Sequence, residues 1–327
     1  MPKISVVIPV YNTGHFLDRT LASITRQTLQ DLDIICVNDG STDNSLEILR
    51  KWEKNDPRVR VIAFPENRGV SSARNCGMDL AMAPYLYFMD SDDWLDDDYL
   101  ESMYSKALET GHDIVINTSM VREYEDARPA STEPGNFGFS KPGYYSPAVV
   151  QSHLLSVLVM RLYKREFVVQ NNIRFPNLKH GGEDNYFASL AELQQTRSYV
   201  YFGPSYHYWQ REGSLAHSMG RGFSYIQSYR LLFDELVARH ISLKGLKLFY
   251  CDIFTIQSRE EFDYIRSYLI DASEAILGQR ELYTVLDNLF FDAVTTSPDY
   301  ESFLTNHNPN IALDYLRKHL KDRQVYL

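Results

Sequence analysis

The sequence predicts an α/β fold built on a mostly parallel sheet with helices on both faces. Short apolar runs typical of buried strands alternate with stretches whose apolar residues recur at helical spacing. Three of the apolar runs stop at polar clusters: Tyr11-Asn12, Asn38-Asp39 and Asp90-Ser91-Asp92. Because ligands bind beyond the carboxyl ends of the strands in such sheets, we expect these clusters to line one crevice.

Five strands and four helices are expected in residues 1–117. The strands are continuous apolar runs, as in strands covered on both faces, at Ile4–Val10, Asp33–Val37, Val59–Phe64, Tyr85–Met89 and Asp113–Asn117. The intervening helices are expected around Leu17–Ile24, Leu46–Trp52, Val70–Ala83 and Leu100–Ala107. Gly40 is expected to permit a tight turn, and Ser41 or Thr42 to cap the helix that follows it.

Residues 118–219 are less regular. Arg122–Pro147 is rich in Pro, Gly, Ser and Tyr and is expected to be a long loop. Further helices are expected near Ala148–Leu158, from Leu162 and from Glu183, and strands at Ile173–Phe175, Tyr199–Phe202 and Tyr206–Trp209. Helical apolar stripes return after about Gly220 and predict a helical C-terminal region over residues 220–327.

Composition narrows the class of protein. The 327 residues are 44% hydrophobic, enough for one large domain or two smaller ones, and a net charge of −10 argues against a nucleic-acid binder. The widely spaced Cys36, Cys76 and Cys251 form neither a disulfide framework nor a zinc pattern. No run approaches the ~20 apolar residues of a membrane helix, and Ile4–Val10 is too short for a signal peptide. We therefore expect a cytoplasmic protein with at most peripheral membrane contact.

The strand at Tyr85–Met89 ends at a cluster of carboxylates. The residues that follow are Asp90, Ser91, Asp92 and Asp93. Carboxylate oxygens suit a hard divalent cation, which can also bridge to phosphates. The alternative is an acidic turn that caps the next helix.

Five ordered motifs resemble those of the family 2 glycosyltransferases, inverting enzymes of the GT-A fold. The motifs are Val7–Asn12, Val37–Asp43, Asn67–Asn75 with Gly77, Asp90–Asp93 and Gly182–Asp184, within roughly residues 4–215. The resemblance implies a Rossmann-like GT-A catalytic domain over 1–219, with a nucleotide-sugar half at 1–117 and an acceptor half at 118–219. Residues 220–327 lie outside the resemblance.

The resemblance also implies the donor contacts. Pro9, Tyr11 and Asn12 would flank the nucleoside, and Asp39 would accept the N3–H of uracil, unless Asp39 only shapes its turn. Further donor-side contacts are implied for Asn67, Arg74, Asp90, Ser91 and Asp93. Arg74 would contact a phosphate or tether the acidic cluster. Asp93 would lie near the sugar or cap the next helix, and Gly77 would permit close helix packing.

The resemblance makes Asp184 the general base that takes the proton of the acceptor hydroxyl, with Glu183 beside it as a substrate contact. The alternative is that Glu183 and Asp184 only stabilise the start of a helix, where the helix dipole also favours carboxylates. We expect the helix N-terminus to lower the pKa of Asp184. The role of Arg211 stays open, because Gln210 stands where many relatives have Arg.

The expected metal ligands are Asp92, Asp90 and His217, and the expected cofactor is Mn²⁺ or Mg²⁺ bridging the diphosphate of the donor. A bound cation of this kind would neutralise the charge that develops on the leaving group. His217 would reach the site from a closing loop, although a lone His is usually not a ligand.

The expected function is transfer of a sugar, from a UDP-sugar, to a hydroxyl of a glycan or lipid-linked acceptor in surface polysaccharide or lipopolysaccharide biosynthesis. One alternative is a sugar-nucleotide pyrophosphorylase, which would need a Gly-rich basic loop where Pro9–Thr13 stands. Another is a non-catalytic nucleotide-sugar-binding scaffold. The C-terminal helices are expected to dock a membrane surface, a second copy in a homo-oligomer, or the catalytic domain.

Overall fold

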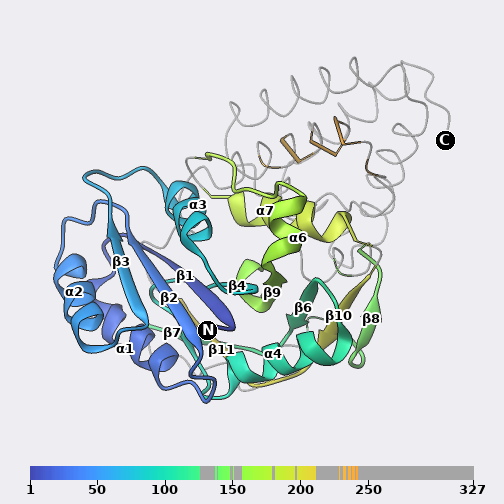
Figure 1. Ribbon diagram of the computed structural model, residues 1–327, viewed down its shortest axis with the longest axis horizontal. Coiled ribbons are helices and arrows are strands. Elements are labelled where there is room, and N and C mark those ends of the chain that lie inside the picture. The colour runs from blue at the N-terminus through green and yellow to red at the C-terminus, as the bar shows by residue number, and fades with distance from the viewer. Residues whose placement is uncertain are drawn as a thin grey trace, which may run out of the picture. The chain divides into compact units, whose positions relative to one another are not determined.

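The computed structural model describes residues 1–125, 137, 139–147, 150, 157–178, 181–195, 197–210, 228, 231, 232, 235, 236, 238, 239 and 241. Its centre is an eight-stranded sheet, with helices around it and a separate three-stranded sheet (Figure 1). Arg211, His217 and most of the region 220–327 lie outside the described residues, as does most of the helix expected near Ala148–Leu158. The predicted division into domains stays a prediction.

The large sheet is mostly parallel, as predicted. Its strands run in the order β3 (Val59–Ala63), β2 (Leu32–Asn38), β1 (Ile4–Val10), β4 (Tyr85–Phe88), β9 (Arg161–Lys164), β6 (Ile114–Asn117), β10 (Ser198–Tyr201) and β8 (Gly143–Tyr145). β1 is parallel to β2 and β4, and β2 is parallel to β3. Every residue of β1 and β2 is buried, so both faces of this part of the sheet are covered.

The helices follow the strands in the alternation that the sequence predicts. They are α1 (Gly14–Thr25), α2 (Ser45–Asn55), α3 (Val70–Leu80), α4 (Tyr99–Thr110), η1 (Leu158–Met160), α6 (Arg165–Gln170) and α7 (Glu183–Leu193). Helix α3 packs on β1 and β2 (Figure 1). A Cβ at Gly77 of α3 would lie 2.3 Å from Cγ1 of Val7, which confirms that this glycine permits close packing of the helix on the sheet.

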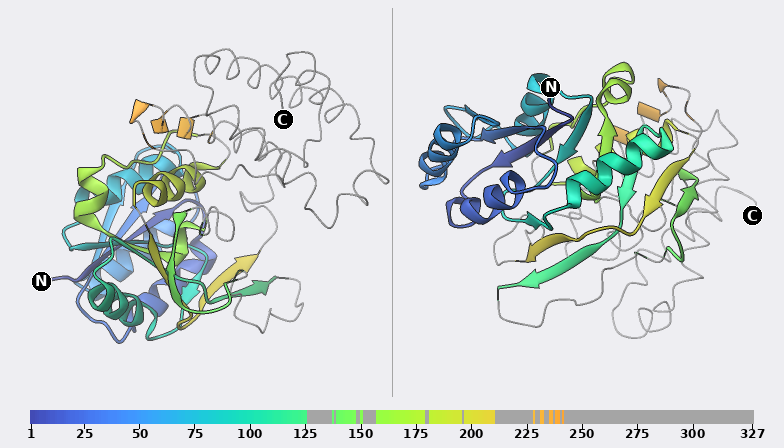
Figure 2. Two further views of the ribbon diagram at one scale, coloured as in Figure 1. Left: turned by 90° about the vertical axis from the view of Figure 1, so that its right-hand side faces the viewer. Right: turned by 60° about the horizontal axis from the view of Figure 1, so that its bottom comes forward.

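The small sheet was not predicted as a unit. It consists of β5 (Trp94–Leu95), β11 (Tyr206–Gln210) and β7 (Met120–Tyr124), in the order β5–β11–β7. β7 and β11 run side by side in parallel (Figure 2). Because β7 and β8 occupy both ends of Arg122–Pro147, the prediction of one long loop there was wrong. Both strands pair with segments more than 50 residues away, so local patterning does not reveal them.

Three other local predictions were wrong. The helix expected from Leu162 is strand β9 followed by α6, because β9 fills the gap between β4 and β6 and pairs antiparallel with both. Ile173–Phe175 joins no ladder. Instead, the Asn75 side chain donates to the Phe175 carbonyl (2.9 Å) and accepts the Phe175 N–H (3.0 Å). Neither Ser41 nor Thr42 caps α2, which begins at Ser45.

Candidate active site

The three polar clusters do meet at one edge of the sheet. β1, β2 and β4 are parallel neighbours, so their carboxyl ends lie side by side. The Asp39 N–H donates to the Val10 carbonyl (2.8 Å), and the Met89 N–H donates to the Val7 carbonyl (3.1 Å). These hydrogen bonds extend the pairing of the strands to the ends at which the polar residues begin.

Asn12 ties the loop after β1 to the loop after β2. Its Oδ1 accepts the Thr42 N–H (2.8 Å), and its own N–H donates to Ser41 Oγ (3.1 Å). Its φ of +52° lies in the left-handed region, which Asn tolerates better than most residues. Pro9 is buried in β1, whereas Tyr11, two residues on, is 47% exposed as a residue. Tyr11 is therefore the residue of this group whose ring can stack on a ligand.

The Asp39 carboxylate is buried beneath the loop before α3. Its Oδ1 accepts the Arg68 N–H (2.7 Å), and its Oδ2 accepts the Gly69 N–H (2.9 Å). Asn67 Oδ1 also accepts the Gly69 N–H (3.2 Å). Asp39 thus shapes this turn, and because each carboxylate oxygen has two lone pairs, it can still accept a further donor.

Gly40 is required by this arrangement. Its φ is +65°, and a Cβ there would lie 2.4 Å from the carbonyl carbon of Glu66. A larger residue would therefore push apart the loops that carry Asp39 and Asn67. This confirms the tight turn predicted at Gly40.

Arg74 of α3 joins the two halves of the site. Its side chain is buried, Nη2 donates to Asp90 Oδ1 (2.8 Å), and Nη1 donates to Glu183 Oε1 (2.6 Å). Burial lowers the pKa of Arg74, but the charges of Asp90, Glu183 and Asp184 outweigh burial and raise it. Arg74 was expected either to contact a phosphate or to tether the acidic cluster, and the structure shows that it tethers the cluster through Asp90.

Asp184 lies in the first turn of α7, with its Oδ1 accepting the Asn185 N–H (2.8 Å). Burial, and then the charge of Glu183, raise the pKa of Asp184 to about 7, although Arg74 and the hydrogen bond oppose this. The expected lowering of this pKa was therefore wrong. The dipole of a helix N-terminus contributes less here than burial beside a second carboxylate.

The side chains of residues Asp90–Asp93, here called the acidic turn, point in different directions. Ser91 is buried, and its Oγ accepts a hydrogen bond from Thr13 Oγ1 (2.9 Å). Asp93 is fully buried and accepts the Tyr206 hydroxyl and the Trp209 N–H (2.8 Å). Burial, and then the charges of Asp92 and Asp90, raise the pKa of Asp93 well above its ordinary value. Asp93 therefore anchors β11 beneath the turn and caps no helix, since α4 begins only at Tyr99.

Asp90 and Asp92 are half-buried at the strand end and offer the oxygen donors that Mg²⁺ and Mn²⁺ prefer. Within the described part of the chain, no group of three His, Cys, Asp or Glu side chains is arranged to hold a metal. Mg²⁺ is commonly bound by one or two carboxylates together with substrate phosphates. The two carboxylates fit that kind of site, in which a diphosphate completes the coordination.

Several residues that support the site were not foreseen from the sequence. Ser228 is buried, and its hydroxyl donates to the carbonyl of Gly182 (2.6 Å), the residue before α7. Tyr206 holds Asp93, and Asn75 holds Phe175. Asn75 belongs to the motif that contains Arg74, and Tyr206 begins a strand predicted from the sequence, whereas Ser228 had no sequence signal.

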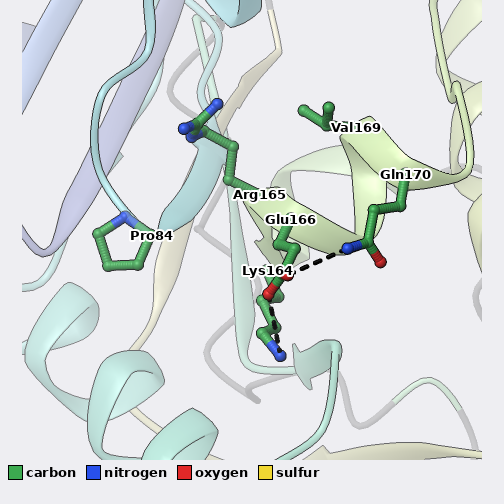
Figure 3. A pocket seen from close by; sticks show the side chains of 6 residues that line it. All are labelled: Pro84, Lys164, Arg165, Glu166, Val169 and Gln170. Atoms are coloured by element: carbon green, nitrogen blue, oxygen red, sulfur yellow. Dashed lines mark hydrogen bonds and ion pairs between the residues drawn. The ribbon is translucent and has the colours of Figure 1, made fainter.

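A hollow of about 430 Å³ lies elsewhere on the molecule. Its lining residues are Pro84, Lys164, Arg165, Glu166, Val169 and Gln170 (Figure 3). Pro84 immediately precedes β4, whereas the acidic turn follows β4. The hollow therefore lies at the opposite edge of the sheet and takes no part in the candidate site.

Comparison with known proteins identifies relatives. Residues 5–168 match the family model described as Glycosyl transferase family 2. The putative glycosyltransferase EpsH of Bacillus subtilis is 32% identical over 213 residues, which are 63% of this chain and 60% of that protein. The poly(ribitol-phosphate) beta-N-acetylglucosaminyltransferase TarP of Staphylococcus aureus is 29% identical over 205 residues, which are 61% of this chain and 60% of that protein. The matched region is thus less than two thirds of either relative.

The crystal structure of S. aureus TarS 1–349 in complex with UDP-GlcNAc has a TM-score of 0.67 to this chain. The match covers 88% of this chain and 83% of that one at 21% identity, which confirms the GT-A fold. Among the described residues, no helix has the length and apolar character needed to cross a membrane.

Proposed function

The chain belongs to glycosyl transferase family 2, and from that premise we propose that it transfers a sugar from a UDP-sugar to an acceptor hydroxyl with inversion at the anomeric carbon. The acceptor is a glycan or a lipid-linked molecule in surface polysaccharide or lipopolysaccharide synthesis. A polymer acceptor is supported by TarP, which is named for poly(ribitol-phosphate). A UDP-sugar donor is supported by the UDP-GlcNAc complex of TarS, whose fold this chain shares.

The observation that carries the proposal is the double ion pair of Arg74. One guanidinium holds Asp90, at the end of β4, and Glu183, at the start of α7. Asp184 is the next residue after Glu183, so the candidate base and the acidic turn are held close to a common point. A transferase that displaces a diphosphate directly requires this juxtaposition of an acceptor-side base and a donor-side cation site.

In the proposed reaction, the Asp184 carboxylate accepts the proton of the acceptor hydroxyl as that oxygen attacks the anomeric carbon. A new C–O bond forms on one face of the sugar while the bond to the diphosphate breaks on the other face. The electron pair of the broken bond leaves with UDP. A pKa of Asp184 near 7 supports this role, because a base of that pKa is effective at neutral pH.

The donor would be held by the loops after β1, β2 and β4. The exposed Tyr11 ring would pack on the base, and Asp39, while holding its turn, would accept the uracil N3–H. Asp92, with Asp90 beside it, would hold Mn²⁺ or Mg²⁺, which when bound stabilises the negative charge that develops on the leaving diphosphate.

The test is the substitution Asp184→Asn, which keeps the shape of the side chain and removes the base. We expect transfer to fall by roughly 10²- to 10⁴-fold, while calorimetry still shows UDP binding in Mn²⁺. Asp31→Asn is the control, because Asp31 is exposed and pairs with Lys3 away from the site. Turnover by Asp184→Asn at the wild-type rate would overturn the assignment of the base. Absence of transfer and of donor hydrolysis by the wild type with a broad panel of nucleotide sugars would overturn the proposed function.

A further inference from the structure

Two adjacent residues of α1 hold three successive carbonyl groups of the acidic turn. The buried Thr20 hydroxyl lies 3.1 Å from the Ser91 carbonyl and 2.8 Å from the Asp93 carbonyl, and it shares its proton between them. Arg19 Nη2 donates to the carbonyl between these two, that of Asp92 (3.1 Å). The main chain that carries the candidate metal ligands is therefore held from α1, which lies about 70 residues earlier in the sequence.

Arg19 is itself held in place by aromatic rings. Its guanidinium carbon lies 3.7 Å from the centroid of the Trp94 ring and 4.7 Å from that of the Trp209 ring. The Trp94 ring in turn stacks on His207, with centroids 5.1 Å apart and an interplanar angle of 10°. A planar guanidinium can stack and donate at the same time, whereas a lysine ammonium cannot stack in this way.

A third residue, Thr13 at the start of α1, also contacts the turn. Thr13 Oγ1 donates to Ser91 Oγ (2.9 Å), and the Thr13 N–H donates to Ser45 Oγ (3.1 Å) at the start of α2. The start and the middle of α1 are thus tied to the edge of the sheet where the donor would bind. With the main chain of residues 91–93 held at each carbonyl, the Asp92 carboxylate extends from a fixed backbone, and Asp90 immediately precedes this held segment.

We propose that Arg19 and Thr20 are positioning residues for donor binding, which hold the acidic turn in the conformation that receives the cation and the diphosphate. This inference rests on the proposed function. Neither residue contacts the donor, and both act through the main chain of Ser91, Asp92 and Asp93. Their loss should weaken donor binding and leave acceptor binding unchanged.

The test uses Thr20→Val and Arg19→Lys in the 327-residue chain. Thr20→Val keeps the shape of the side chain and removes the shared proton, and Arg19→Lys keeps the charge and removes the planar group. We expect each variant to bind UDP in Mn²⁺ about tenfold more weakly in calorimetry, because buried carbonyls lose their donor. Thr20→Ser restores the hydroxyl and should bind within about twofold of wild type. In steady-state assays, KM should rise for the donor and stay unchanged for the acceptor.

Two matched controls lie at the C-terminal end of α1, at its last residue Thr25 and its C-cap residue Arg26. Thr25 Oγ1 donates to the Leu21 carbonyl (2.8 Å), and Arg26 Nε pairs with Asp97 Oδ1 (2.6 Å). Neither contacts residues 90–93 in the hydrogen bonds of the described chain. Thr25→Val and Arg26→Gln should therefore leave UDP affinity unchanged. Loss of affinity in these controls equal to that of Thr20→Val would overturn the proposal, because the effect would then belong to α1 as a whole.

A measurement without ligand separates this inference from the proposed function. Hydrogen–deuterium exchange of a peptide that covers residues 88–95 should be faster in Thr20→Val and Arg19→Lys than in wild type or the two controls. Unchanged exchange there overturns the inference, and so does faster exchange with unchanged UDP affinity. If the wild type binds no UDP, the proposed function fails, and the exchange rates alone then decide whether Arg19 and Thr20 hold the turn.

Discussion

At the scale of single residues, the surroundings of Asp184 determine its chemistry more than its place in the helix. A carboxylate in the first turn of a helix is usually stabilised as an anion. Here burial and the charge of Glu183 raise the pKa of Asp184 to about 7. Arg74, which would favour the anion, is already shared between Asp90 and Glu183. The residue therefore combines the geometry of a helix start with the basicity of a buried carboxyl.

The raised pKa of Asp184 predicts the pH dependence of transfer. Asp184 is protonated below a pH of about 7, and the protonated acid cannot accept the hydroxyl proton, so kcat should fall tenfold per pH unit on the acid side and level off above it. The measurement is kcat from about pH 5.5 to about pH 8.5 with saturating donor and Mn²⁺. Glu183→Gln removes a neighbouring negative charge and should move the midpoint to lower pH. A profile without an acid limb would contradict the role of Asp184.

Loss of the Asp92 side chain should weaken metal binding more than it lowers the stability of the fold. Asp92→Ala should remove the Mn²⁺-dependent part of UDP binding and lower the melting temperature of the free protein much less than loss of a core residue would, because the side chain is only half-buried. Calorimetry with UDP in Mn²⁺ and in EDTA measures this. Asp98→Ala is the control, since Asp98 is exposed and makes no capping hydrogen bond to α4. Equal UDP affinity of Asp92→Ala and wild type in Mn²⁺ would count against the metal role.

At the scale of elements, helix α3 determines how the two halves of the site meet. Its start is held by Asp39 through the Arg68 and Gly69 N–H groups. Its middle carries Arg74, which reaches Asp90 and Glu183, and Asn75, which holds Phe175. The position of α3 on β1 is therefore coupled to the position of the candidate base.

Gly77→Ala tests that coupling. The added Cβ would lie 2.3 Å from Cγ1 of Val7, so α3 must move or the sheet must yield, at a cost of about 1–3 kcal/mol in the free energy of unfolding. Thermal and urea unfolding measure this loss. Gly143→Ala is the matched control, because its Cβ would meet only a Tyr145 ring carbon at 3.9 Å. Val7→Ala in the same chain should recover part of the loss, and no recovery would show that the clash is not its source.

At the scale of the whole molecule, two groups of parallel strands in the large sheet are joined through one inserted antiparallel strand. β9 lies between β4 and β6 and runs antiparallel to both. It therefore links the strands that end in the donor-side residues to β6 and β10, and α6 follows it directly. A donor that binds at the ends of β1, β2 and β4 should for this reason stabilise the whole eight-stranded sheet and the helices packed on it.

A nucleotide panel tests that expectation. We expect UDP with Mn²⁺ to raise the melting temperature of the full chain, and EDTA to abolish the rise, because a ligand that binds only the folded state stabilises it by mass action. GDP, CMP and TDP, each with Mn²⁺, are the comparison. A larger rise with another nucleotide would keep the fold and overturn Asp39 as a reader of uracil. No rise with any nucleotide would favour a protein that has lost donor binding.

The local parts of the fold and site could be predicted from the sequence. The strands and helices of residues 1–117 appear as apolar runs and helical spacing, and Asp90, Asp92 and Asp184 appear in ordered motifs. What could not be predicted depends on distant partners. β9 is a strand because β4 and β6 leave a gap for it, and β7 and β8 pair with β11 and β10. The short sequence Leu162-Tyr163-Lys164-Arg165 does not by itself distinguish a central strand from a helix.

The sequence by itself determined the fold class, the polar clusters at three strand ends and the family, because apolar periodicity and motif order are local properties of the chain. Only the tertiary structure decided that Arg74 is bound to Asp90 and Glu183, that Asp93 lies beneath the acidic turn, and that Arg19 and Thr20 hold that turn. Only the tertiary structure reversed the expected pKa shift of Asp184. The physical reason is that burial, charge and hydrogen bonds act through space, for example between Arg19 and Asp92, 73 positions apart, and between Arg74 and Glu183, 109 positions apart, and no local pattern records those contacts.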